Sequence, residues 1–316
     1  MPQPTLKNRT SRRLHVAMVA VALTVAVGTV AASPPSGADP SPHGAFPGGY
    51  LTATGNGVVT AFGDAVLRGE PAGLALRAPI VGITDERFAC PVGGPRAGIS
   101  CDYGAQGGYW LVAADGGVFA YGRAGFYGSL AGTALSAPVV GLAATPDDGG
   151  YWLVTRDGAV YPFGDATALS PSTGLTLNAP IVGIESTGGD QGYWLVAADG
   201  GVFAYGAAVF HGSAATEHLR APVVGISSTP GGNGYWLVAA DGGVFAFGGA
   251  VFKGSMAATG LAAPVVGMAG TIDGYWLVGA DGGVFAFGDA RFVGSLAGTA
   301  LTAPVVGISA PELPPV

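Results

Sequence analysis

The sequence contains little charge and few chemically reactive residues. Charged residues make up 10% of the 316 positions, with two cysteines, four histidines, and 13 basic against 20 acidic residues. No basic block occurs beyond the N-terminal segment, which argues against nucleic acid as a partner. The 57 glycines have no three-residue period, so the chain is not collagen. An apolar content of 49% with so few charges argues against disorder.

Only one long apolar run is present, and it lies at the N-terminus. Basic residues between Lys7 and Arg13 precede an apolar stretch from Val16 to Ala32, and small residues follow. This layout is typical of a secretory signal peptide. We therefore predict that residues 1–38 are a signal peptide. The alternative is an uncleaved anchor, for which 17 residues rich in alanine are barely long enough.

Two details of this segment stay open. Cleavage can follow Ala32 or Ala38, and Arg12-Arg13 resembles a twin-arginine signal with His15 where that motif prefers phenylalanine. Removing the segment takes four basic and no acidic residues, which moves the net charge from −7 to −11. We expect a secreted or cell-wall-associated protein without stable membrane insertion after cleavage.

The remainder of the chain is built from internal repeats. The stretch GYWLVAADGGVFAYG occurs identically at 108–122 and 192–206, and four further copies begin at positions 49, 150, 234 and 274. The aligned tyrosines are Tyr50, Tyr109, Tyr151, Tyr193, Tyr235 and Tyr275, spaced 59, 42, 42, 42 and 40 residues apart. A period of this length is typical of propellers and solenoids. The long first spacing contains a 17-residue insertion, within residues 85–107.

Each repeat predicts four short strands, for example 223–227, 235–238, 244–247 and 252–255. An Asp-Gly turn joins the second strand to the third, and such turns are a strong hairpin signal. The second and third strands are nearly all apolar, which indicates strands covered on both faces. A repeated four-stranded sheet of this kind is a propeller blade.

The phase of the repeats predicts how the chain ends meet. The repeat region starts with the second strand of a repeat at Tyr50 and stops after the first strand of a repeat near Pro304. We therefore expect an all-β, six-bladed β-propeller of four-stranded blades, with the C-terminal strand completing the first blade and no exposed sheet edge. The expected organisation is a signal peptide at 1–38, a Pro/Gly-rich linker at 39–48, the propeller at 49–310 and a tail at 311–316. An open solenoid is the alternative, and it would need caps.

The repeats resemble a family of exported bacterial proteins, mostly actinobacterial, with GYWLV-x-x-DGGVFAFG blades. The resemblance covers Gly49 to about Ala310. It implies a β-propeller in an extracellular or wall-associated setting, without a settled ligand or catalytic residues. In that family the blades occur alone or beside wall-active enzyme domains, and we expect no enzymatic role of the longer relatives to transfer to this sequence.

The sequence offers no clear catalytic motif, metal site or cofactor. It lacks a Gly-x-Ser-x-Gly elbow, a phosphate-binding loop and the sialidase box. The recurring aspartates are read as turn residues rather than as calcium ligands: Asp115, Asp157, Asp199, Asp241 and Asp281. The run Asp147-Asp148 is a weak calcium candidate, because staggered acidic spacing is missing.

The five tryptophans all follow a motif tyrosine. They are Trp110, Trp152, Trp194, Trp236 and Trp276. Their strict repetition inside an apolar strand favours packing between blades over stacking on sugars.

Both cysteines, Cys90 and Cys101, lie in the insertion. Export favours a disulfide between them. Because the insertion is the one departure from the repeat, it is either a place for individual function or a tolerated loop.

A candidate ligand site comes from the residue before each Ala-Pro. In a closed ring these six positions would surround one mouth of the channel: Arg77, Ser136, Asn178, Arg220, Ala262 and Thr302. The two arginines would face each other across that mouth and attract a carboxylate or phosphate. The alternative is that they bind loop carbonyls or keep the mouth soluble.

Three functions remain open from the sequence. The first is a non-enzymatic, monomeric binding or scaffold protein for a protein or cell-wall polysaccharide. The second is a hydrolase or lyase acting on glycans or lactones at the channel mouth. The third is a purely structural wall component.

Overall fold

The computed structural model describes residues 48–71, 73–86, 107–169, 177–189 and 191–310. All described residues belong to one compact unit. The predicted signal peptide, the linker up to residue 47, the tail at 311–316, and Cys90 and Cys101 lie outside the described residues. Within the described ranges, no helix has the length and apolar character needed to cross a membrane.

The described fold is all-β and consists of six three-stranded antiparallel sheets. One edge strand of each sheet packs against the equivalent edge strands of the neighbouring sheets and is called the inner strand here. The inner strands are β3 (Ile80–Asp85), β6 (Val139–Ala144), β9 (Ile181–Ser186), β12 (Val223–Ser228), β15 (Val265–Gly270) and β18 (Val305–Ser309). The middle strands are β4 (Tyr109–Ala113), β7 (Gly150–Thr155), β10 (Gly192–Ala197), β13 (Gly234–Ala239), β16 (Gly274–Gly279) and β1 (Gly49–Thr54). The outer strands are β5 (Val118–Tyr121), β8 (Val160–Gly164), β11 (Val202–Gly206), β14 (Val244–Gly248), β17 (Val284–Gly288) and β2 (Val59–Gly63).

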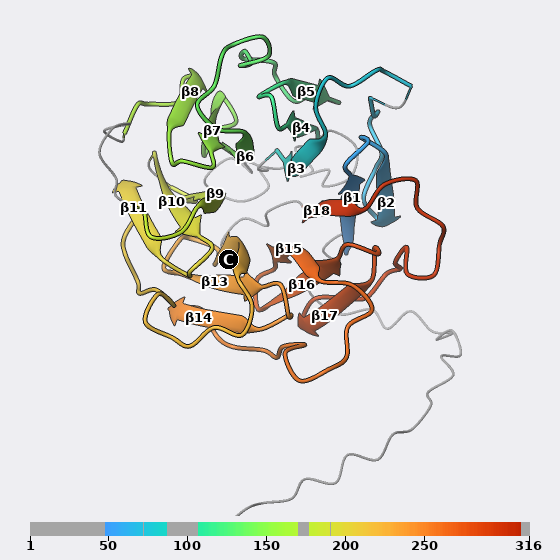
Figure 1. Ribbon diagram of the computed structural model, residues 1–316, viewed down its shortest axis with the longest axis vertical. Coiled ribbons are helices and arrows are strands. Elements are labelled where there is room, and N and C mark those ends of the chain that lie inside the picture. The colour runs from blue at the N-terminus through green and yellow to red at the C-terminus, as the bar shows by residue number, and fades with distance from the viewer. Residues whose placement is uncertain (1–47, 72, 87–106, 170–176, 190, 311–316) are drawn as a thin grey trace, which may run out of the picture. The chain divides into compact units, whose positions relative to one another are not determined.

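The two ends of the described chain meet in one sheet. Strand β18 pairs with β1, with Leu51 opposite Ser309, and β1 pairs with β2. Inner strands of successive sheets pack against each other from β3 to β18, and β18 packs against β3 (Figure 1). The fold is therefore compatible with a β-propeller.

The predicted fourth strand is absent from the described residues. The stretches expected to form it, called rim segments here, are Phe126–Ser129, Phe210–Ser213, Phe252–Ser255 and Phe292–Ser295, and none is a strand. Each contains a glycine with positive φ, such as 140° at Gly254, where an added Cβ would lie 2.5 Å from the Phe287 ring. This conformation takes the chain out of the extended region that a sheet partner requires. The prediction of four strands per sheet was wrong for this reason.

A tyrosine hydroxyl holds each rim segment in place of a neighbouring strand. The hydroxyl of Tyr235, on β13, accepts the backbone N–H of His211 at 3.2 Å and donates to the carbonyl of Gly212 at 2.5 Å. The same bond to a rim carbonyl recurs at Tyr151 and Tyr275. Tyr109 donates in the same way to the carbonyl of Gly69, which belongs to the first repeat. Tyr50 bonds the carbonyl of Gly294 in this way. The motif tyrosine therefore links its own sheet to the preceding one, and it links the first sheet to the last.

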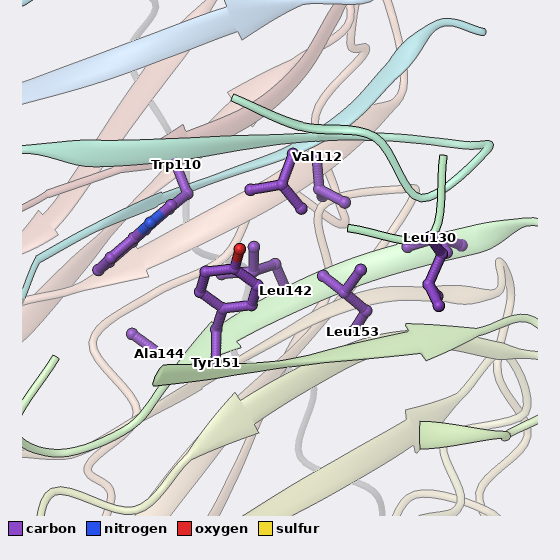
Figure 2. Close-up of a cluster of buried hydrophobic side chains, with 9 residues drawn as sticks. Trp110, Val112, Leu130, Leu142, Ala144, Tyr151 and Leu153 are labelled. Carbon is purple, nitrogen blue, oxygen red and sulfur yellow. The ribbon is translucent and has the colours of Figure 1, made fainter. Parts of the chain in front are cut away.

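The motif tryptophans fill the seams between sheets, as predicted. Trp110, Trp152 and Trp194 have no exposed surface. Each tryptophan ring packs against the tyrosine of the next middle strand, at centroid distances from 5.2 Å for Trp276 on Tyr50 to 5.9 Å for Trp110 on Tyr151. Figure 2 shows Trp110 from β4 turned toward Tyr151 from β7, with Leu142 and Leu153 beside them. Every indole N–H donates to a carbonyl 15 residues later, at 2.7–2.9 Å.

Replacing Tyr235 by phenylalanine tests the role of this hydroxyl. The change leaves the N–H of His211 and the carbonyl of Gly212 without their partner, which costs about 1–3 kcal/mol of unfolding free energy. Tyr161→Phe is the matched control, since the Tyr161 hydroxyl has no hydrogen-bond partner among the described residues, and it should change stability little. Urea denaturation of both variants measures the difference. Equal midpoints would show that the hydroxyl contributes nothing.

Candidate functional site

All six inner strands contribute to one cavity of about 210 Å³. Its wall includes the glycine in the third position of the inner strands, for example Gly82, Gly183 and Gly267. These glycines let the strands approach each other: a Cβ added at Gly267 would lie 3.6 Å from the Cα of Gly307 on the next strand. The cavity is therefore a place where the described residues can hold a small ligand.

Two consecutive positions near the end of each inner strand give the cavity its chemical character. The fifth position carries Thr84, Ala143, Glu185, Ser227, Ala269 and Ser309 in chain order. The sixth carries Asp85, Ala144, Ser186, Ser228, Gly270 and Ala310. The wall therefore combines hydroxyls and small apolar groups with two carboxylates.

Side chains at the fifth position connect one inner strand to the next. Ser227 Oγ accepts the N–H of Gly270 at 3.0 Å, and Ser309 Oγ accepts the N–H of Asp85 at 2.8 Å. Glu185 Oε1 accepts both the N–H and the hydroxyl of Ser228, at 3.0 and 2.8 Å. These bonds satisfy backbone donors that have no ladder partner on that side. Much of the polar lining thus has a structural role.

Asp85 is different from these residues. It is half-buried as a residue, but its Oδ2 atom has almost no accessible surface and, among the described residues, no hydrogen-bond partner. Burial raises the pKa of this carboxyl to about 7, with a smaller rise from the charge of Glu86, while a hydrogen bond from Ser309 lowers it. A carboxyl group in this state is costly for the fold, and such groups are often found in functional sites.

The residues predicted to form a cationic mouth do not line this cavity. Arg77, Ser136, Asn178 and Arg220 are exposed and precede the inner strands, whereas the polar part of the cavity wall is at the strands' far ends. Ser136 donates to Asp157 at the following hairpin turn, and Thr302 accepts from Asn56 at 2.9 Å in the corresponding place. Ligand binding by the two arginines stays a prediction.

Four of the five hairpin aspartates bond the backbone of their own turn, as predicted, and the fifth, Asp157, accepts from the hydroxyls of Thr155 and Ser136. Oδ1 of Asp115, Asp199, Asp241 and Asp281 accepts the N–H two residues later, at 3.0 Å in each case. In the weak calcium candidate, the hydroxyl oxygen of Thr145 lies 3.1 Å from Oδ1 of both Asp147 and Asp165. Among the described residues, no group of three or more histidine, cysteine or acidic side chains is placed to hold a metal ion.

Several large apolar side chains are exposed, and most follow the repeat. The first residue of each rim segment is a phenylalanine with more than half of its surface exposed: Phe126 (61%), Phe210 (56%), Phe252 (54%) and Phe292 (61%). Leu67 occupies the equivalent place in the first repeat and is also exposed. The buried tryptophans cannot stack on a sugar, so these phenylalanines are the aromatic rings available to a partner.

Sequence reasoning missed Asp85, Glu185 and the rim phenylalanines. A usable signal was present, because Asp85 and Glu185 are the acidic residues in two aligned positions otherwise occupied by alanine, serine, threonine and glycine. The sequence pattern places the rim phenylalanines in a fourth strand, and that placement does not predict their exposure.

Comparison with known proteins adds no identity. No protein-family model matches the chain, and no curated protein matches it.

Proposed function

We propose that the chain is an exported binding protein whose repeats form a closed, six-bladed β-propeller and hold a cell-wall glycan, with a protein as the alternative partner. Its activity is binding rather than catalysis. The six sheets, the shared cavity and the pairing of β18 with β1 support the propeller. The N-terminal signal and the GYWLV-x-x-DGGVFAFG resemblance support export.

The exposed phenylalanine of the rim segments is the observation on which the binding function depends. A solvent-exposed aromatic ring at one position of the repeat is a group that the fold does not use for its own core. Val209 and Val251 precede Phe210 and Phe252 and are also exposed, at 60% and 55%, so each of these two segments offers a small apolar patch. Exposed apolar groups of this kind mark contact surfaces when they gather in patches.

The repetition of the ring favours a repetitive ligand. An aromatic face has both an apolar surface and a partial negative charge, so it can pack on the C–H face of a sugar. A single such contact is weak. Several identical contacts on one polymer add through the high effective concentration of the remaining sites. A glycan chain with many identical units fits this arrangement better than a compact ligand.

Retention on purified cell wall tests the proposal. Replacing Phe126, Phe210, Phe252 and Phe292 together by serine should lower retention at least tenfold, because the contacts act jointly. Leu74→Ser is the control, since Leu74 is 61% exposed but lies outside the rim segments. Retention equal to that of the unchanged protein would contradict the proposal, and preferential capture on immobilised soluble proteins would favour the protein partner.

The same assay separates the rim from the two arginines. Arg77→Ala and Arg220→Ala, singly and together, should lower retention and weaken its salt dependence if the cationic positions bind an acidic polymer. If only the phenylalanine variant loses retention, the arginines are not the binding site. Circular dichroism of each variant confirms that the fold is intact.

A further inference from the structure

The cavity is negatively charged and has no compensating cation on its described wall. Asp85 on β3 and Glu185 on β9 both line it, and none of the described lining residues is lysine, arginine or histidine. The strand between them, β6, carries Ala143 and Ala144 at the aligned positions. Small side chains therefore separate the two carboxylates. A cavity of this charge favours a positively charged occupant.

Asp85 supplies the acceptor that such an occupant needs. Within the part of the chain that the structure describes, its buried Oδ2 has no hydrogen-bond partner, whereas Oε1 of Glu185 already accepts from Ser228. The fold does not require a carboxylate at this position, because the other repeats use alanine, serine or glycine there. A buried acceptor without a donor costs free energy unless a ligand satisfies it. Ligand binding explains why a carboxylate that destabilises the fold is present at a position where a small residue is sufficient for folding.

We propose that the cavity binds a small primary ammonium compound, whose N–H groups donate to the carboxylate of Asp85 and to the neighbouring hydroxyl oxygens. The volume of about 210 Å³ lies below the range of drug-sized pockets and suits a compact ligand. The wall offers two separated carboxylates and several serine and threonine hydroxyls, which match the three N–H donors of an ammonium group. A calcium ion needs six to eight converging oxygen ligands instead.

The surroundings of Asp85 make this binding sensitive to pH. The titratable neighbours are Glu86, next in the chain, and Tyr109, which faces Asp85 across the β3–β4 register. From β18 comes the Ser309 hydroxyl, from β6 only apolar residues line the wall, and Glu185 stands on β9. Because the pKa of Asp85 is about 7, the carboxyl is mostly ionised near pH 8 and mostly protonated near pH 5. An alkylammonium keeps its charge at both values, as lysine does.

Ethylammonium chloride is the test probe, and backbone amide chemical shifts of β3 and β18 in the full chain are the readout. We expect ethylammonium to bind the unchanged protein near pH 8. Near pH 5 we expect it to bind at least tenfold more weakly. Asp85→Asn should weaken binding at least tenfold near pH 8. Asp241→Asn is the matched control: it removes the same charge, keeps an oxygen for the hairpin turn, and should bind as the unchanged protein does.

Three competing probes decide what the cavity recognises. Tetramethylammonium has the charge but no N–H, ethanol is neutral, and calcium chloride supplies a metal ion. Binding of any of these as tightly as ethylammonium would overturn the proposal, and so would full affinity in Asp85→Asn. If that variant does not fold, the pH profile of the unchanged protein decides, since equal affinity near pH 5 and pH 8 contradicts a role for Asp85.

Discussion

Deleting residues 303–316 is expected to destabilise the whole repeat region, because the deletion removes β18 from the sheet that joins the two chain ends. Val305 and Ile308 are buried in that strand, and burying such a side chain contributes about 1.5–3 kcal/mol. The loss of both, with the β18–β1 hydrogen bonds and the bond from Asp85 to Ser309, exceeds roughly 4 kcal/mol. For a domain of this size that lowers the unfolding temperature by about 10 °C or more.

Differential scanning calorimetry measures this change. Deletion of residues 311–316 alone is the control, since it keeps β18, and its unfolding temperature should stay near that of the full chain. An unfolding temperature unchanged by the longer deletion would show that the first sheet does not depend on the last strand.

Asp85→Asn is expected to make the protein more stable near pH 8 and to remove much of its pH dependence between pH 5 and pH 8. The folded carboxyl has a pKa of about 7, against an ordinary value of 3.8. Between these values the folded state keeps a proton that the unfolded state releases, so stability falls as the pH rises toward 7. At about 1.4 kcal/mol per pKa unit, the decrease from pH 5 to pH 8 is roughly 3 kcal/mol.

Urea denaturation across this pH range checks the prediction. Asp147 and Asp157 affect stability at lower pH than this range. Hydrogen bonds lower the pKa of both carboxyls, so the stabilisation that they contribute is lost only in more acidic solution. Asp241→Asn should keep the full pH dependence. A parallel pH profile for Asp85→Asn and the unchanged protein would mean that Asp85 is not the responsible group. A gain in stability on removing a buried carboxyl would also fit a residue kept for binding rather than for folding.

The all-β class and the repeated sheets follow from the sequence alone. The period near 42 residues, the apolar runs and the Asp-Gly turns each report local geometry: a turn needs a glycine, and a covered strand needs apolar residues on both faces. The seam position of Trp110 and its equivalents was predictable for the same reason. A tryptophan repeated inside an apolar strand has to be buried, and only the neighbouring sheet can cover it.

Only the tertiary structure decided the conformation of the rim segments and the surroundings of Asp85. The stretch from Phe252 to Ser255 reads as a strand, but its glycine has positive φ and the hydroxyl of Tyr275, distant in sequence, replaces a strand partner. The environment of Asp85 was also decided by the tertiary structure. In the sequence Asp85 is the residue before an insertion, and its burial, its missing hydrogen-bond partner among the described residues and its raised pKa arise because strands far apart in the chain surround it. A local pattern specifies which residues form strands and turns, whereas solvent exclusion and charge depend on contacts between repeats that no local pattern contains.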